Sequence, residues 1–451
     1  MEMLEKIIAD LSAAIWGWPM IILLLGTHLF LTVRLRFPQL YIFKAIRLSV
    51  KKDSGSKGDV SHFSALATAL AATIGTGNII GVATAVTLGG PGAVFWCWLT
   101  GVLGIATKYS EGLLAVKYRV QTSNGKMLGG PMYALERGLK LKWLATLFCI
   151  FTAVAAFGIG NTVQVNSISM LLAETWQIPD YITGLVISLL VGLIILFGLK
   201  GIAKVCSFLV PVMAVFYVAG CLFILYVNAP YIGEAVSLII DSAFNARAAG
   251  GGFLGSTLLM AARYGIARGL FSNESGLGSA PIVAAAAKAR NPVRQALVSS
   301  TGTFWDTVVI CALTGLVLVS SVIAHPDIDY TQGAALTKAA FSKIPVVGSW
   351  VLSVGILTFA FSTILGWSYY GERAVEYLGG KRLIKSYRIL WVVATFFGAI
   401  LNLSFVWNIA DVMNALMAIP NLLSLLLLSG VILKETRKYL WNNRLDEADE
   451  N

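Results

Sequence analysis

Charged residues are scarce in this chain of 451 residues. Only 13% of the residues are Asp, Glu, Lys or Arg, whereas 57% are hydrophobic, and the mean hydropathy is +0.77. Since about 25% of the residues of a typical soluble domain are charged, this composition excludes an ordinary soluble globular protein. It predicts an all-α membrane protein that crosses the bilayer many times.

Cysteine and histidine are also rare, and neither forms a cluster along the sequence. The five cysteines lie in apolar segments without paired spacing, and the three histidines are far apart. We therefore expect the cysteines to be small buried residues and expect no structural metal and no cofactor. The chain contains neither an H-E-x-x-H zinc motif nor a G-x-x-x-x-G-K-[ST] nucleotide-binding loop, which argues against an enzyme of either class. We do not expect a cleavable signal peptide at the N-terminus.

Long apolar segments predict eleven membrane spans, with boundaries that are accurate to a few residues. The seventh segment is too long for one straight helix, so its first part is expected at the outer surface and its span is expected to start near Ile266. The eleven ranges are 13–33, 60–88, 93–116, 143–173, 181–199, 205–227, 253–287, 295–323, 348–376, 389–404 and 407–433.

Lysine and arginine fall mostly in alternate loops between these segments. The chain has 34 such residues and a net charge of +11, and the basic loops start at residues 34, 117, 200, 288, 381 and 434. Cytoplasmic loops of membrane proteins are enriched in Lys and Arg. The pattern therefore predicts a multi-pass protein of the cell (plasma) membrane with its N-terminus outside and its C-terminus in the cytoplasm. The positive charge is then a topology signal, and no nucleic acid is expected as a partner.

Two of the apolar segments carry interruptions at matching positions. When the first span is set aside, the first and sixth of the remaining ten contain ATIGTGNIIG from residue 72 and GLFSNESGLGSAP from residue 269. Paired Gly/Pro-interrupted segments in two halves of a chain indicate a transporter binding site. The pattern predicts a five-plus-five inverted repeat after one extra N-terminal transmembrane helix. The expected units are 1–58, 59–228 with a break at 73–78, 229–433 with a break at 270–277, and a tail at 434–451.

An unwound turn explains why polar residues and glycines lie in the middle of an apolar segment. Gly75 and Gly77 permit backbone angles that other residues resist. Unwinding exposes amides that suit an anion and carbonyls that suit a cation, so a small zwitterion fits both. Two other interpretations stay open: the glycines allow close helix packing, or the GxG forms part of a dinucleotide site. The second of these needs a soluble βαβ unit.

The chain resembles the alanine/glycine:cation symporter family, within the amino acid-polyamine-cation superfamily. The resemblance rests on ATIGTGNIIGVATA at 72–85, GGPMYALERGL at 129–139 and GIARGLFSNESGLGSAP at 265–281, and it extends over nearly all of the chain after residue 60. It implies the inverted-repeat fold of the sodium-coupled leucine transporter. It also implies uptake of alanine or glycine, with sodium as the coupling ion and membrane lipid as the surroundings.

The resemblance also implies which residues bind the substrate. The carboxylate is expected at the amides of Gly75, Thr76 and Gly77, and the ammonium at the carbonyls of Thr73, Leu270 and Phe271. A substrate as small as alanine also needs bulky side chains to close its cavity. Phe271 and Trp367 are the candidates, although either ring could instead pack in the core. Gln164 could contact the substrate or bond a neighbouring helix. Asn78, Asn273 and Glu274 complete the expected substrate set. Glu274 is a departure from the sodium-leucine relatives, and it could hold the ammonium or a structural partner at the break.

The same resemblance implies one sodium site and suggests a second ion site. The first takes carbonyls of Ala71, Ile74 and Phe359 and hydroxyls of Ser362 and Thr363, although these hydroxyls could also bond to their own helix. The second would use Asn78, Ser272 and Asp306. A carboxylate inside a span suggests a functional site, but Asp306 could also be protonated or paired within the scaffold.

Four alternatives compete with a sodium symporter for alanine and glycine. The two nearest are coupling to protons and transport of another small zwitterion, such as serine. An intramembrane serine protease would need a base beside its nucleophile, and no histidine lies in a plausible partner helix of Ser275. A channel would show filter rings and oligomeric symmetry rather than an internal inverted pair. The sequence leaves the oligomeric state open.

Overall fold

The computed structural model describes residues 7–8, 10–11, 14–51, 53, 56–245, 257–331, 333–401 and 404–449. Nearly all of its regular structure is helical. The helices are α2 (Trp18–Arg34), η1 (Pro38–Tyr41), α3 (Ile42–Ser49), α4 (His62–Thr73), η2 (Thr76–Asn78), α5 (Ile80–Gly89), α6 (Gly92–Lys117), α7 (Pro131–Tyr133), η3 (Ala134–Gly138), α8 (Lys142–Phe157), η4 (Gly158–Thr162), α9 (Val163–Trp176), α10 (Asp180–Ile195), α11 (Gly198–Val227), α12 (Ala229–Phe244), α13 (Leu258–Asn273), α14 (Pro281–Ala284), α15 (Pro292–Thr303), η5 (Phe304–Cys311), α16 (Ala312–Ala324), α17 (Gly333–Ser342), α18 (Val347–Gly379), α19 (Arg382–Ile400), α20 (Ser404–Leu427), α21 (Ser429–Thr436) and η6 (Arg437–Trp441).

Fewer helices pass a strict test for membrane spans than the sequence predicts. Among the described residues, six are long and apolar enough, or eight if each strongly bent pair is one span. Helix α10 has 16 residues, and α13 also has 16 because it ends at the second break. The long helix α6 carries Lys108 and Glu111 in its interior. These features account for part of the difference, and the total of eleven stays a prediction.

The first interrupted segment is a pair of helices with a sharp bend. Helix α4 ends at Thr73, α5 begins at Ile80, and the two rods are bent by 61°. The change of direction occurs at Gly75, whose backbone is extended (φ −133°, ψ −157°). A methyl group there would lie 2.6 Å from Thr363 Oγ1 of α18, so the absence of a side chain lets α18 approach the break. The α-helix is thus interrupted between Thr73 and Ile80.

The second break begins at Glu274, inside the predicted range of 270–277 but after its first four residues. Helix α13 continues through Asn273, and it already begins at Leu258 rather than near Ile266. Glu274 ends the helix in a left-handed conformation (φ 54°), and its amide donates to the carbonyl of Leu270 at 3.0 Å. The chain then runs without regular helix until Pro281 opens α14. Residues 251–256, expected at the outer surface, lie outside the described part of the chain.

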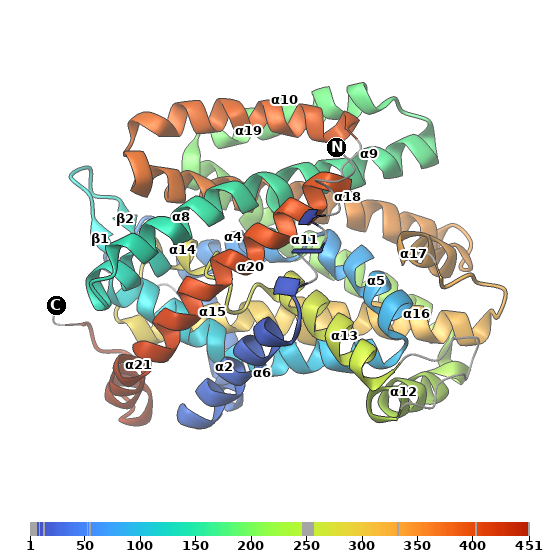
Figure 1. The fold of residues 1–451 in the computed structure, drawn as a ribbon, viewed down its shortest axis with the longest axis horizontal. Helices are drawn as coiled ribbons and strands as arrows, with labels where there is room; N and C mark the ends of the chain where they lie inside the picture. The colour runs from blue at the N-terminus through green and yellow to red at the C-terminus, as the bar shows by residue number, and fades with distance from the viewer. Residues whose placement is uncertain are drawn as a thin grey trace.

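The two breaks lie against each other in the middle of the molecule. A Cβ added to Gly77 would be 3.1 Å from the ring of Phe271 and 3.5 Å from Cα of Ser272. Helix α18 passes beside both breaks, and α6 packs along α13 and α15. In Figure 1, α10 and α19 lie side by side in a layer above this central group. The broken segments are therefore enclosed by continuous helices that fix their positions.

Several of the predicted basic loops meet at one end of the molecule, here called the basic end. Arg119 donates to the carbonyl of Lys57, and Lys51 pairs with Asp446 of the C-terminal tail. The hairpin of β1 (Val120–Gln121) and β2 (Met127–Leu128) and the C-terminus lie at the left of Figure 1, whereas α12 and α17 lie at the right. This arrangement agrees with the alternation of charge in the sequence.

Candidate functional site

Polar side chains occupy the first break and bond its main chain. The amide of Gly75 donates to Asn78 Oδ1 at 2.9 Å, and the amide of Thr76 donates to Gln164 Oε1 at 3.3 Å. Two of the three amides expected to meet a substrate carboxylate are thus already bonded to side chains. Among the described buried polar atoms, Thr76 Oγ1 has no hydrogen-bond partner. A carboxylate at this turn would replace the oxygen of Gln164 and find a free hydroxyl beside it.

Five oxygen atoms converge between α4 and α18. Thr363 Oγ1 lies 3.0 Å from the carbonyl oxygen of Ala71, 3.4 Å from that of Ile74 and 3.0 Å from that of Phe359. Ser362 Oγ lies 3.2 Å from the oxygen of Ala71 and 2.9 Å from that of Phe359. All of these residues are buried. The full set expected for the sodium ion is therefore gathered at one point.

The chemistry of this oxygen set fits a hard monovalent cation. Hard cations prefer oxygen ligands, and multivalent ions usually take carboxylates as well. The set contains carbonyls and hydroxyls only, and the hydroxyls bond carbonyls of α4 as well as of their own helix. No group of three His, Cys, Asp or Glu side chains among the described residues could hold a metal ion, so a transition-metal site has no candidate there. A bound cation would join the end of α4 to α18.

A second polar cluster surrounds the carboxylate of Asp306. Asn78 Nδ2 donates to Oδ1 at 2.7 Å, while the hydroxyls of Ser272 and Thr307 donate to Oδ2 at 2.9 and 2.6 Å. These residues come from the first break, from the last turn of α13 and from η5, and Asp306 is fully buried. The three residues expected at the second ion site are thus in direct contact. They form either a scaffold or the ligands of a cation.

Glu274 bonds the protein itself at the second break. Its Oε1 accepts a hydrogen bond from Trp367 Nε1 at 2.9 Å, and its other oxygen accepts one from the hydroxyl of Ser279. Glu274 therefore ties the break to α18, which matches the structural-partner alternative from the sequence. Trp367 is nearly fully buried, and its indole nitrogen is used in this bond. Its side chain packs against Gly160, and its ring lies 5.5 Å from the ring of Tyr370.

The other expected substrate residues differ in how available they are. The carbonyl of Leu270 accepts a hydrogen bond from the amide of Glu274. It is therefore already bonded, whereas the sequence analysis expected it to meet the substrate ammonium. Asn273 Oδ1 accepts from the amide of Ser275 at 2.9 Å, whereas its Nδ2 has no partner among the described residues. Thr73 lies at the end of α4 beside Lys108. Leu270 is therefore the weakest member of the expected set.

Glu111 of α6 contacts the second break, and the sequence analysis missed this role. Its Oε1 accepts hydrogen bonds from the amides of Gly276 and Gly278 at 3.0 and 3.1 Å and from Asn421 Nδ2 at 2.7 Å. Its other oxygen, Oε2, lies 3.9 Å from Lys108 Nζ. Glu111 therefore pairs with Lys108 and also bonds the chain at the second break. A polar side chain in the interior of a span was the available signal. Glu111 and Asn421 hold the irregular chain after Glu274 in place.

Two cavities of different size lie on opposite sides of the breaks. On the side of α5 and α13, a cavity of about 180 Å³ is lined by Thr76, Gly77 and Phe271 together with Arg268. On the side of the basic end, the cavity beside Thr73 has only about 10 Å³. Typical ligand sites measure roughly 300–1,000 Å³, so the larger cavity suits a small ligand. The space beside Thr73 is too small for a substrate in this structure.

Comparisons with known proteins agree with this arrangement. The chain is 52% identical over 453 residues to an uncharacterized transporter of Haemophilus influenzae, with 99% of each chain covered. It is 50% identical over 442 residues to the sodium/alanine symporter AgcS of Methanococcus maripaludis, covering 96% of this chain and 97% of the relative.

The fold resembles a solved transporter at low sequence identity. The structure of MhsT in complex with L-phenylalanine matches 87% of this chain and 96% of its own with a TM-score of 0.60 and 14% identity, which indicates a shared fold only. The model of the family described as "Sodium:alanine symporter family" matches residues 1–451. With that match and 50% identity to a named symporter, this multi-pass transporter belongs to the sodium:alanine symporter family.

Proposed function

We propose that this chain imports alanine or glycine into the cell together with sodium, by alternating access to a site between the two broken helices. The convergence of five oxygens from Ala71, Ile74, Phe359, Ser362 and Thr363 carries the proposal. It supplies a monovalent cation site that is directly connected to the turn at Gly75. Sodium binding there would fix the end of α4 and so order the amides that receive the substrate.

The size of the larger cavity supports a small zwitterion as the substrate. About 180 Å³ beside Gly77 and Phe271 leaves little room for a long side chain. The ring of Phe271 touches the break, and Trp367 is fixed by its bond to Glu274. We propose that these two rings select against larger amino acids. The carboxylate would meet the turn at Thr76 and Gly77, and the ammonium would meet the carbonyl ends of α4 and α13.

Sodium-driven uptake of labelled alanine into proteoliposomes tests the function. We expect an inward sodium gradient to drive accumulation of alanine, with glycine competing and serine, glutamine and leucine competing less. Equal uptake with and without the gradient would contradict sodium coupling. Uptake that follows a pH gradient at constant sodium would instead support proton coupling. Competition by both enantiomers of alanine in the same assay would report the stereochemical preference.

The buried charges around the breaks support a second coupling cation at Asp306. Three carboxylates and one ammonium are buried there, from Glu111, Glu274, Asp306 and Lys108. As ionised groups they carry two net negative charges. Isolated charges in a low-dielectric interior are strongly unfavourable. Two bound cations would balance them when a zwitterion, which is neutral overall, occupies the site.

Replacing Asp306 by asparagine should make uptake less steeply dependent on sodium. The first ion site keeps all of its oxygens, so alanine uptake should persist, whereas the charge that would hold the second cation is lost. The measurement is the sodium dependence of uptake at pH 6 and pH 8. Asp180→Asn is the matched control, because Asp180 bonds Ser169 at the start of α10, away from the breaks. An unchanged sodium dependence in Asp306→Asn would assign Asp306 to the scaffold.

A further inference from the structure

A buried charged network lies at the basic end, where α4 begins. Arg294 Nε of α15 lies 2.9 Å from Asp53 Oδ2, and the same oxygen lies 2.9 Å from His62 Nε2. The side chains of Asp53, His62 and Arg294 are at most 1% exposed. His62 is the first residue of α4, and its Nδ1 lies 2.5 Å from Gln295 Oε1. The network therefore holds the start of α4 against α15.

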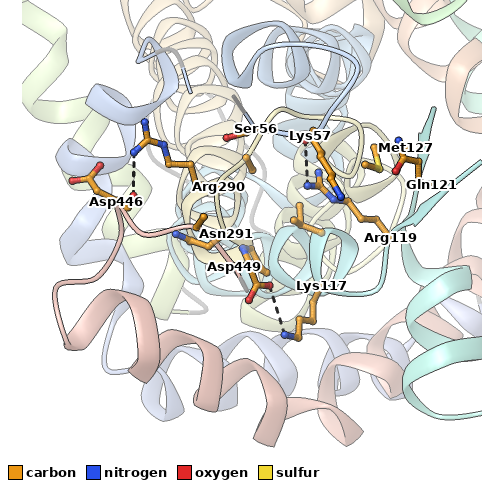
Figure 2. A pocket seen from close by; sticks show the side chains of 14 residues that line it. Ser56, Lys57, Lys117, Arg119, Gln121, Met127, Arg290, Asn291, Asp446 and Asp449 are labelled. Atoms are coloured by element: carbon orange, nitrogen blue, oxygen red, sulfur yellow. Dashed lines mark hydrogen bonds and ion pairs between the residues drawn. The ribbon is translucent and has the colours of Figure 1, made fainter. Parts of the chain in front are cut away.

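The C-terminal tail completes this network from outside. Arg294 Nη1 lies 2.6 Å from Asp446 Oδ1, so one guanidinium joins the buried Asp53 to a carboxylate of the tail. Figure 2 shows Asp446 beside Arg290, whose Nη1 donates to the main-chain oxygen of Asp446 at 3.0 Å. Asn291 Nδ2 donates to the main-chain oxygens of Leu445 and Glu447 at 2.9 and 2.8 Å. The tail is thus bonded to the first turn of α15.

Main-chain bonds tie the same two regions together. The amide of Lys288 donates to the oxygen of Val60 at 2.8 Å, and the amides of Asp59 and Val60 donate to the oxygen of Ala286. These bonds join the residues before α4 to those after α14. Arg119 also joins the segment before α4 to the segment after α14, because it donates to the carbonyls of Lys57 and Ala287. Separation of α4 from α15 would have to break all of these contacts.

The position of α4 gives the network a role in transport. Helix α4 runs from His62 at the basic end to Thr73 at the first break, and the break makes it a rod separate from α5. The cavity between Thr73, Lys108 and Ser299 has only about 10 Å³, so the route to the basic end is closed while the network is formed. The route can open only if α4 moves away from α14 and α15.

We propose that residues 445–449 of the tail form an inner-gate latch, in which Asp446 holds Arg294 on Asp53 and so keeps α4 closed against α15. The proposal rests on the proposed function in one respect, namely that substrate leaves through the basic end. Each transport cycle would release the tail from α15. Sodium would act in the same direction as the latch, because it joins the other end of α4 to α18.

The latch predicts that Asp446→Asn opens the inner route. The variant keeps the size of the side chain but weakens its bond to the Arg294 guanidinium. We place a reporter cysteine at Ser299, which lines the closed cavity, in an otherwise full-length chain whose described native cysteines are buried. In sodium-free inside-out vesicles, a membrane-impermeant maleimide should modify the reporter about fivefold faster, as expected for loss of roughly 1 kcal/mol from a partly exposed ion pair. Saturating sodium should reduce the difference.

Glu447→Gln provides the matched control. It makes the same chemical change one residue away, yet the side chain of Glu447 pairs with Arg444 and not with Arg294. Labelling should stay at the wild-type rate in Glu447→Gln and return to it in Asp446→Glu. Arg290→Gln removes the bond to the main-chain oxygen of Asp446 and also the ion pair of Arg290 Nε with Asp53 Oδ1 at 3.7 Å. It should accelerate labelling, and it serves as the test if Asp446→Asn does not insert into the membrane. Equal rates in Asp446→Asn and wild type, or equal acceleration in Glu447→Gln, would overturn the latch.

The labelling assay separates the latch from the proposed function. It measures access to Ser299 in the absence of alanine and sodium, so it reports on the gate whether or not the chain carries alanine. Failure of sodium-driven alanine uptake in the wild type would contradict the proposed function alone. Unchanged labelling in the variants would contradict the latch alone.

Discussion

Replacing Thr363 by valine should raise the sodium concentration for half-maximal alanine uptake by about 30-fold, as expected for loss of about 2 kcal/mol of ligand interaction. Valine keeps the branched shape but removes the hydroxyl that contacts the carbonyl oxygens of Ala71, Ile74 and Phe359. The cation would then lose one of five oxygens at a point where no water can replace it. Sodium dependence of uptake at saturating alanine is the measurement.

Two variants show whether this effect belongs to the ion site. Thr358→Val makes the same change on the same helix, but the hydroxyl of Thr358 bonds only to carbonyls of α18 itself. It should leave sodium dependence within a factor of two. Thr363→Ser restores a hydroxyl and should recover most of the affinity. Wild-type sodium dependence in Thr363→Val would mean that this hydroxyl only bonds back to its own helix, and the cation would have to lie elsewhere.

The broken helices could be predicted from the sequence because their residues conflict with an apolar span. Glycine and polar groups are unfavourable in the middle of a span unless the chain there serves another purpose. Gly75 and Gly77 mark the first interruption in the sequence, and helix α4 ends at Thr73, just before them. The second begins later than expected, since Leu270 to Asn273 continue the helix and the stop is the left-handed Glu274. A non-glycine residue in that conformation has no clear sequence signal.

Contacts between distant segments could not be read from the sequence. The bond between Trp367 and Glu274 spans 93 residues, and that between Arg294 and Asp446 spans 152. The sequence analysis named Trp367 and Glu274 without the bond between them, and it did not single out Arg294 or Asp446. Glu111 shows the same limit: besides its neighbour Lys108 at i−3, it bonds the amide of Gly276, 165 residues away at the second break. Which two side chains bond each other is decided by how the helices pack in the folded protein.

Residues outside the spans were the hardest to assign. Helices α12 and α17 lie in stretches that the sequence analysis treated as loops. Helix α3 contains Phe43, which is 73% exposed, beside the basic residues Lys44 and Arg47. Helix α3 has only eight residues, so the search for membrane spans in the sequence did not detect it. Such helices gain their stability from tertiary packing rather than from their own sequence, so periodicity alone identifies them poorly.

Replacing Gly75 by alanine should lower alanine uptake by about 5- to 150-fold, since overpacking of a close contact costs about 1–3 kcal/mol. The added methyl would lie 2.6 Å from Thr363 Oγ1 and 3.4 Å from Gln164 Oε1. The backbone at Gly75 is extended, so alanine is not excluded by its own conformation. The loss should therefore come from the neighbours: one methyl displaces a sodium ligand and the amide oxygen that bonds Thr76. Sodium and alanine affinities should both fall.

Neighbouring glycines allow this effect to be assigned. Gly26 of α2 has nothing within 4 Å of an added Cβ, so Gly26→Ala should keep uptake within a factor of two and controls for insertion and expression. At Gly77 a methyl would lie 3.1 Å from the ring of Phe271, with no residue of the first sodium site among its nearest neighbours. Gly77→Ala should therefore raise the KM for alanine while sodium affinity changes less. If Gly75→Ala instead lowers only the alanine affinity, the turn contacts the substrate without controlling the ion. The two binding events would then be coupled through another part of the protein.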